Sequence, residues 1–458
     1  MTNSLANAIH FAHENRARFL DELGELIAIP SISADSTHTP DIKRAAEWLA
    51  NKLKSLGFEK IQIMDTGGHP VVFGENMQAG KDAPTMIVYG HYDVQPADPL
   101  DLWDSPPFAA TIKDDLLFAR GATDMKGQVL ASFAAVEAAL QTGAMPVNVK
   151  YLLEGEEETG SPTLGTFIEA NKELFAADFA LNPDAGMLSP SQPSITYALR
   201  GLAYFEVNLT GPSHDLHSGQ FGGTVRNPAN ELASLIGGMH DDKGRITLPG
   251  FYDKVRELDA QEREEMAKLP EGDGFYKAHT GVSVLWGEEG YSAVERASGR
   301  PTLDVNGMLS GYIGEGAKTV LPAKAMAKIS CRLVADQHPK EVEAQLNEYI
   351  AARIHPSMDW SVKMLSSDVA SISARESKEI QAMSAALQEV FDAPVLFKRE
   401  GGTIPVVGYM QDKLGVESVL TGFGLPEDRM HSPNERLHLP TWEKGIDALI
   451  HFIFNLGK

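Results

Sequence analysis

The chain has 458 residues, and its 40 Lys and Arg against 63 Asp and Glu give a formal net charge of −23 at pH 7. A single hydrophobic core stops growing at about 250–300 residues, so we expect two or three domains. Hydrophobic residues make up 43% of the chain, which excludes a disordered protein. The acidic balance argues against nucleic acid or an anionic membrane as the main partner.

The cysteine content and the N-terminal segment both bear on the cellular compartment. Cys331 is the only cysteine, which excludes an internal disulfide and fits a reducing compartment. The N-terminal residues lack the basic and then apolar order of a signal peptide, and no apolar run reaches the roughly 18 residues of a membrane span. We therefore expect a cytoplasmic protein with no membrane partner.

Helices and strands alternate over the first part of the chain. Their patterns predict helices over 4–28, from Pro40 to Gly57 and over 125–141, and buried strands over 85–89, 147–153 and 179–181. This rhythm is typical of an α/β fold with a mostly parallel sheet that is covered by helices.

The pattern changes near residue 198. Strands over 203–209 and 325–334 alternate apolar and polar residues, as in a sheet with one wet face, and helical patterns cover 227–239 and 339–353. The helical pattern of the first part returns over 377–391 and 442–456. We expect a discontinuous outer domain, 1–198 with 366–458, that carries an inserted α+β domain, 199–365.

Polar residues of a catalytic kind follow the buried strands, where α/β proteins bind ligands. His91 and Asp93 come directly after the first strand and share a face if the extended backbone continues, although a plain polar strand end is an equal interpretation. Glu156, Glu157 and Glu158 follow the second strand, either as a solvated loop or as a group whose repulsion a cation offsets.

Three further positions have ordinary explanations when each is taken alone. Asp124 precedes a long helix, so a helix cap is the better interpretation there. Asp184 lies in a sequence typical of turns, and a lone histidine such as His431 is usually structural. Together with the strand-end residues, they supply the nitrogen and oxygen donors of a site for two divalent cations.

The motifs YGHYDVQP, RGATDMKG, EGEEETGS, NPDAG, DLHSG and HSPNE occur in an order that resembles the M20 family of metallopeptidases and amidohydrolases. The stretches DLHSGQFGG, GAKTVLPAKA and REGGTIPV are similar to its carnosinase-like, cytosolic dipeptidase branch. The resemblance implies a catalytic domain of the zinc-exopeptidase type with an inserted lid and dimerisation domain. It runs from about residue 15 to the C-terminus.

The resemblance implies a role for each polar residue of the outer domain. His91 and Asp184 would bind one metal, Glu158 and His431 the other, and Asp124 would bridge them. Two ions per subunit are expected, Zn²⁺ first, with Mn²⁺ or Co²⁺ as alternatives. The remaining implied roles are a general base at Glu157, an orienting residue for His91 at Asp93, and no direct role for Glu156.

The resemblance also implies functional residues in the inserted domain and in a glycine-rich turn. His217 matches a histidine that reaches the active site of the partner subunit in a homodimer and stabilises the oxyanion. Arg332 matches the arginine that holds the free carboxylate of the substrate, with Gly402 and Thr403 in a glycine-rich turn beside the same carboxylate. Asn306 lies near a substrate-contact position where the dipeptidase branch often has His.

We therefore expect a metal-dependent dipeptidase that cleaves dipeptides or short peptides with a free C-terminal carboxylate. An N-acyl-amino-acid amidohydrolase of the same family is the alternative, because both reactions attack an amide near a free carboxylate. A non-catalytic metal-binding scaffold is a third hypothesis. It predicts a lost base or ligand, and every such position is intact in this chain.

Overall fold

The structure is a computed structural model that describes residues 2–457, and the chain divides into two compact units. Unit 1 comprises Met1–Tyr197, Ser373–Lys398 and Pro405–Lys458, and unit 2 comprises Ala198–Ile372 and Arg399–Ile404. The expected boundary at 365/366 therefore lies at 372/373, because a strand of unit 2 continues to residue 368. The segment 399–404, which the sequence pattern assigns to the outer domain, belongs to unit 2.

A nine-stranded sheet, most of whose residues belong to unit 1, has the order β1-β2-β6-β3-β7-β17-β8-β15, with β16 paired to β8. The strands are β1 Glu59–Met64, β2 Val71–Asn76, β3 Thr85–His91, β6 Asn148–Glu154, β7 Phe179–Asn182, β8 Ser194–Leu199, β15 Ser371–Ile372, β16 Leu396–Glu400 and β17 Ser418–Leu420. The four central strands, β6, β3, β7 and β17, are parallel, and antiparallel strands flank them on both sides. The predicted α/β class with a mostly parallel core is confirmed.

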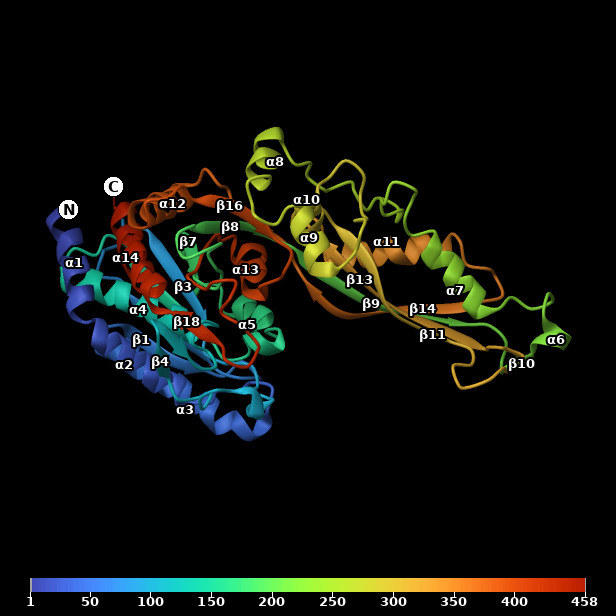
Figure 1. Ribbon diagram of the computed structural model, residues 1–458, viewed down its shortest axis with the longest axis horizontal. Helices are drawn as coiled ribbons and strands as arrows, with labels where there is room; N and C mark the ends of the chain where they lie inside the picture. Colours follow the sequence, from blue (N-terminus) through green and yellow to red (C-terminus); the bar gives the residue numbers. More distant parts are fainter. Residues whose placement is uncertain (1, 458) are drawn as a thin grey trace. The chain divides into compact units, whose positions relative to one another are not determined.

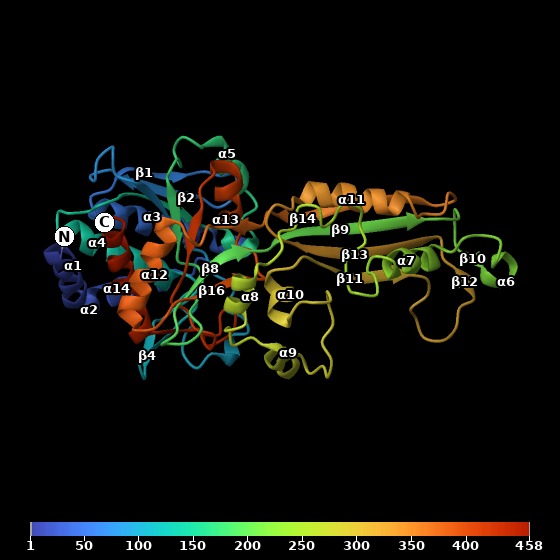
Figure 2. The ribbon, with the colours of Figure 1, turned by 90° about the horizontal axis from the view of Figure 1, so that it is seen from above.

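The helices of unit 1 cover both faces of this sheet. They are α1 Thr2–Glu14, α2 Arg16–Ile27, α3 Thr39–Ser55, α4 Lys126–Gln141, α5 Leu164–Ala170, α12 Lys378–Phe391, α13 Pro405–Tyr409 and α14 Leu439–Asn455. Figures 1 and 2 show α4, α12 and α14 on one side of the strands and α5 and α13 on the other. Helix α4 is buried from Lys126 to Ala139, which explains why its sequence is apolar all round.

Short elements complete unit 1. The helical turns are η1 Ser36–His38, η2 Leu100–Leu102, η3 Glu157–Thr159 and η4 Met410–Leu414, and a small sheet joins β4 Thr111–Lys113, β5 Leu116–Phe118 and β18 Arg436–His438. The helix expected over 4–28 is two helices, α1 and α2. They separate at Asn15, whose side-chain amide donates to the Phe11 carbonyl.

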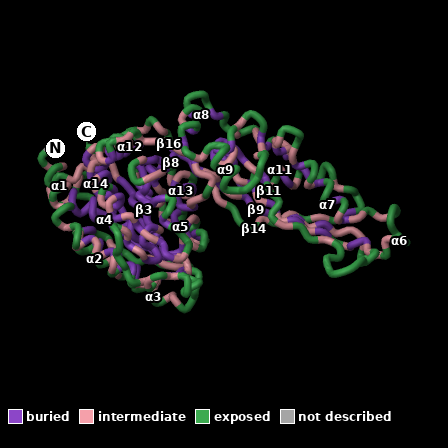
Figure 3. Tube along the Cα trace, viewed as in Figure 1, coloured by how far each residue is buried: buried purple, intermediate pink, exposed green. Residues whose placement is uncertain are grey.

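Unit 2 contains a four-stranded antiparallel sheet with the order β11-β13-β9-β14. Its strands are β9 Gly201–Thr210, β11 Thr302–Ser310, β13 Lys324–Leu333 and β14 Asp359–Asp368, and its two longest helices are α7 Pro228–Gly237 and α11 Pro339–Ala351. Buried and half-exposed residues alternate strictly along β9 (Figure 3), as its sequence predicts. Its buried face packs with α7 and α11 into one hydrophobic core.

Smaller elements of unit 2 lie around this sheet. They are β10 Leu216–His217, β12 Val320–Leu321, α6 Ser218–Phe221, α8 Ala260–Met266, α9 Asp273–Thr280 and α10 Ala293–Ser298. Cys331 is buried in β13, and burial raises the pKa of its thiol. Across residues 2–457, no helix has both the length and the apolar character that a membrane span needs.

Candidate metal centre

Three parallel strands of unit 1 end at the same edge of the sheet, and each leads into polar residues. His91 is the last residue of β3 and pairs in register with Glu154 at the end of β6. Glu157 and Glu158 begin the η3 turn just after β6, and Asp184 follows β7 by two residues. The strand-end positions that the sequence singles out therefore meet at one edge, as parallel strands require.

Asp124 lies in the tight loop that leads into α4. Gly121 of this loop has a φ of +82°, and a Cβ on Gly127 would lie 2.1 Å from the Ala122 carbonyl oxygen. The helix N-cap is Met125, without a side-chain capping bond, so Asp124 does not cap α4. Its carboxylate instead contacts two histidines, with Oδ1 3.1 Å from Nε2 of His91 and Oδ2 2.9 Å from Nε2 of His431.

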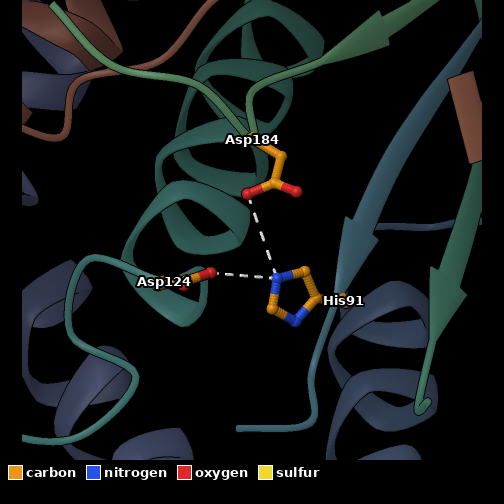
Figure 4. A group of neighbouring side chains, drawn as sticks. All are labelled: His91, Asp124 and Asp184. Carbon is orange, nitrogen blue, oxygen red and sulfur yellow. Dashed lines mark hydrogen bonds and ion pairs between the residues drawn. The ribbon is translucent and has the colours of Figure 1, made fainter. Parts of the chain in front are cut away.

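The candidate ligands form two groups that share Asp124. In the first group, Nε2 of His91 faces Asp124 and lies 3.9 Å from Oδ1 of Asp184 (Figure 4). In the second group, Nε2 of His431 lies 3.2 Å from Oε2 of Glu158 as well as close to Asp124. Within each group the donor atoms all lie within 4.8 Å of one another. Imidazole nitrogens combined with carboxylate oxygens fit a pair of Zn²⁺ or Mn²⁺ ions.

The pKa shifts at this edge reflect an excess of negative charge. Burial lowers the pKa of His91, but its hydrogen bonds to Asp124 and Asp93 outweigh this and raise the pKa well above 6.5. Hydrogen bonds to Asp124 and Glu158 raise the pKa of His431 to about 10. The negative potential that raises these pKa values is the one that a divalent cation would offset.

Glu157 differs from its neighbours because it lies outside both ligand groups. Its carboxylate makes no hydrogen bond within residues 2–457. Burial, together with the charges of Asp184, Glu158 and Asp93, raises the pKa of Glu157 to about 9, although His91 opposes the shift. A carboxylate that is close to the ligands but not committed to another partner can accept a proton from a reacting group.

Asp93 connects the two halves of the site. Its carboxylate accepts hydrogen bonds from the backbone N–H groups of Glu157, at 3.2 Å, and Glu158, at 3.0 Å. One of its oxygens also lies 3.5 Å from Nδ1 of His91. Asp93 is fully buried and so fixes both the imidazole and the η3 turn.

Sequence reasoning missed Glu435 as a functional residue, although it lies inside the HSPNE motif. Its buried carboxylate pairs with Arg120 at 2.8 Å and accepts hydrogen bonds from the backbone N–H groups of Gly121, Thr123 and Asp124 at 2.9–3.1 Å. One carboxylate therefore holds the entire Asp124 loop. Only the spacing of Glu435 from His431 could have pointed to this role.

Two other polar residues support the ligands. Gln95, in the YGHYDVQP motif, donates from Nε2 to Oε2 of Glu158 at 2.8 Å and was also missed. Glu156 accepts hydrogen bonds from the backbone N–H groups of His69, at 3.0 Å, and Thr163, at 2.9 Å. These hydrogen bonds hold the loop of Glu156 in place, and Glu156 belongs to neither ligand group. That Glu156 has no direct role stays a prediction.

The five residues predicted to contact the substrate all lie in unit 2, although the sequence pattern assigns Gly402 and Thr403 to the outer domain. Nη1 of Arg332 donates to Oγ1 of Thr403 at 3.1 Å, and Gly402 is the exposed neighbour of Thr403. Arg332 and Asn306 line the same cavity of about 490 Å³. His217 is exposed and accepts a hydrogen bond from the Gly219 N–H at the start of α6. The substrate roles of these residues stay predictions.

A parallel α/β sheet with two His and carboxylate groups that share one aspartate is the arrangement of a metal-dependent hydrolase. The model of peptidase family M20/M25/M40 matches residues 87–455, and the chain belongs to this family. The family membership predicted from the motifs is therefore confirmed.

Relatives match over nearly the whole chain. The Cys-Gly metallodipeptidase DUG1 of Candida albicans is 32% identical, over 97% of this chain and 96% of that protein. The structure of the M20 family metallo-carboxypeptidase Sso-CP2 from Sulfolobus solfataricus has a TM-score of 0.80 and 33% identity, and covers 96% of this chain and 99% of its own. Human carnosine dipeptidase 1 has a TM-score of 0.72 and 30% identity, with 99% and 98% covered.

Proposed function

We propose that the protein is a metal-dependent dipeptidase that hydrolyses the peptide bond of dipeptides and short peptides with a free C-terminal carboxylate. The observation that carries this proposal is the pair of ligand groups that share Asp124, with the uncommitted carboxylate of Glu157 beside them. Names of relatives also support it, because two of those described above are dipeptidases.

In this mechanism His91 and Asp184 would hold one cation, Glu158 and His431 would hold the other, and Asp124 belongs to both ligand groups. When bound, the cations would polarise the scissile carbonyl and make a water easier to deprotonate. Glu157 accepts the proton of the attacking water and delivers it to the leaving amine. We assign Zn²⁺ as the first choice of metal, with Mn²⁺ or Co²⁺ as alternatives.

Unit 2 supplies the substrate contacts in this proposal. Arg332 pairs with the free carboxylate of the substrate, supported by Thr403 and Gly402, and Asn306 contacts the substrate from the same cavity as Arg332. His217 stabilises the oxyanion in the active site of a second copy of the chain, so the working form is a homodimer joined through unit 2. A cytoplasmic location is part of the same proposal.

The test uses chelator-stripped protein that is re-supplied with Zn²⁺, Mn²⁺ or Co²⁺ and offered dipeptides, tripeptides and N-acetyl amino acids. Metal-dependent release of amino acids from dipeptides is the expected result. Hydrolysis of N-acetyl amino acids alone would contradict the proposal and indicate the amidohydrolase reaction. Asp184→Asn and His431→Gln should each lower the number of ions bound per subunit, measured by elemental analysis, whereas the exposed variant Glu169→Gln should not.

A further inference from the structure

Unit 2 contains a cavity of about 490 Å³ whose lining has two different chemical characters. The lining includes the arginines Arg200 and Arg332, and it also includes aromatic and aliphatic side chains. Every lining residue belongs to unit 2, so the cavity is complete within this unit. Its volume lies in the range of small-ligand pockets.

Arg200 and Arg332 have no carboxylate partner within residues 2–457. Arg200 donates only to backbone carbonyl oxygens, at 3.3 Å to Gly401 and at 3.5 Å to Arg296 and Arg300, and Arg332 donates to the Thr403 hydroxyl. Burial, followed by the nearby charge of Arg332, lowers the pKa of Arg200 to about 10. The two guanidinium groups therefore repel each other, and the charge of Asp304 offsets this repulsion only in part.

A third arginine of the same cavity gives an internal contrast. Arg300 is almost fully buried and makes two hydrogen bonds with Glu288, from Nε at 2.8 Å and from Nη2 at 2.9 Å. Glu288 also accepts from Arg245 at 2.8 Å. Arg300 also lies 3.6 Å from a carboxylate oxygen of Glu257, so its positive charge is compensated inside the protein. The charge of Arg200 and Arg332 is instead available to an anionic ligand.

Apolar and aromatic side chains form the apolar wall of the cavity. This wall comprises Tyr276 from α9, Ile246, Leu285 and Trp286. Trp286 is 70% exposed, and its ring makes an edge contact with the ring of His240, at 5.2 Å between centroids. A large exposed indole on the rim of a cavity gains from contact with an apolar group.

We propose that this cavity is the specificity pocket for the C-terminal residue of the substrate, with Arg200 and Arg332 binding its carboxylate and Tyr276 and Trp286 binding a large apolar side chain. This inference rests on the proposed peptidase function. Arg200 and Trp286 are the new specificity residues. The substrate class is a peptide that ends in a residue such as Phe or Leu.

An acidic C-terminal side chain fits the cavity less well. Asp304 on β11 also lines it, and its negative charge acts on Arg200 and His240. A second carboxylate on the ligand would meet this charge and the apolar wall, so one carboxylate and one apolar group match the cavity best.

The first test measures binding without catalysis, by isothermal titration calorimetry on metal-free protein. N-acetyl-L-phenylalanine should bind at least about tenfold more tightly than N-acetylglycine or N-acetyl-L-aspartate, because only it fills the apolar wall. The amide of N-acetyl-L-phenylalanine should bind at least about tenfold more weakly than the acid, because it lacks the charge that the arginines complement.

Trp286→Ala should remove the preference for phenylalanine over glycine, whereas Val284→Ala should retain it. Val284 is a matched control, since it lies two residues away, is 78% exposed and does not line the cavity. Equal affinity for the phenylalanine and glycine derivatives, tighter binding of the aspartate derivative, or an unchanged preference in Trp286→Ala would each overturn the inference.

The second test compares kcat/KM for Ala-Phe and Ala-Gly with metal-loaded enzyme and separates the two proposals. If neither dipeptide is cleaved but the binding order holds, the peptidase function fails and the assignment of the pocket to this ligand class stands. If both are cleaved with equal kcat/KM and the acetyl derivatives bind equally, the function stands and the pocket assignment fails.

Discussion

The two units carry charged clusters of opposite sign. In unit 1, Asp124, Glu157, Glu158 and Asp184 crowd around two histidines, and the pKa values of His431 and Glu157 are raised. In unit 2, four arginines line one cavity together with Glu288 and Asp304, and the pKa of Arg200 is lowered. Arg200 and Arg332 have no carboxylate as a hydrogen-bond partner within residues 2–457, so the first cluster is suited to cations and this pair of arginines to a carboxylate.

Each unit also contains a compensated ion pair for comparison. Glu435 and Arg120 are both buried in unit 1, and Glu288 and Arg300 are both buried in unit 2. Within each pair the charges offset each other inside the protein. The contrast teaches that candidate binding residues lie where buried or half-buried charge stays uncompensated. In a compensated pair, removal of one partner would leave the other charge buried alone and destabilise the fold.

The largest effect is expected from Glu157→Gln, which removes the proton acceptor but retains the shape of the side chain. We expect kcat to fall by about 10²–10⁴-fold, because general-base catalysis contributes that much. Bound metal, measured by elemental analysis, should stay at the wild-type level, because Glu157 is outside both ligand groups. A variant with near-normal kcat would show that Glu157 is not the base.

Glu435→Gln tests the compensated pair of unit 1. Arg120 would stay buried without its counter-charge, so the free energy of unfolding in urea should fall by about 3 kcal/mol. The Asp124 loop should also loosen, with metal affinity reduced by about 10–100-fold. Glu169→Gln, at an exposed site, is the control. Unchanged stability would mean that Glu435 does not hold the loop.

Arg332→Met in unit 2 should weaken substrate binding with little effect on stability, whereas Glu435→Gln should lower stability. Arg332 is half-exposed and has no carboxylate partner, so the free energy of unfolding should change by no more than about 0.5 kcal/mol. The KM for a dipeptide should rise by about 10–100-fold through the lost charge-assisted hydrogen bonds. A large loss of stability with an unchanged KM would place Arg332 among the structural residues.

The smallest expected effect is the pH dependence of the stability of the metal-free protein. The folded-state pKa of His431, at about 10, is above its ordinary value of 6.5, so protonation of His431 stabilises the fold. This stability is fully present below about pH 6.5 and is lost as the pH rises towards 10. Urea unfolding of metal-free protein should show this decline, and His431→Gln should weaken it. A stability that rises over this window would contradict the assignment.

Much of the architecture follows from local sequence. The apolar runs over 85–89 and 147–153 predict the buried strands β3 and β6. The alternation over 203–209 predicts strand β9, which has one buried and one half-exposed face. These predictions are confirmed because side-chain periodicity depends on neighbouring residues alone. The ordered motifs also predict the family, which the match over residues 87–455 confirms.

The tertiary structure decided those features that depend on contacts between residues far apart in the sequence. The local sequence around Asp124 predicts a helix cap. In the structure, its carboxylate instead contacts His431, which lies 307 positions further along the chain. Glu435 holds the Asp124 loop across a similar separation, and the segment 399–404 joins unit 2 through contacts such as that of Thr403 with Arg332. The sequence by itself determined the apolar periodicity of strands such as β3, β6 and β9 and the family to which the chain belongs. Which charges find partners was decided only by packing, because compensation depends on distances of a few ångströms between segments that no local pattern relates.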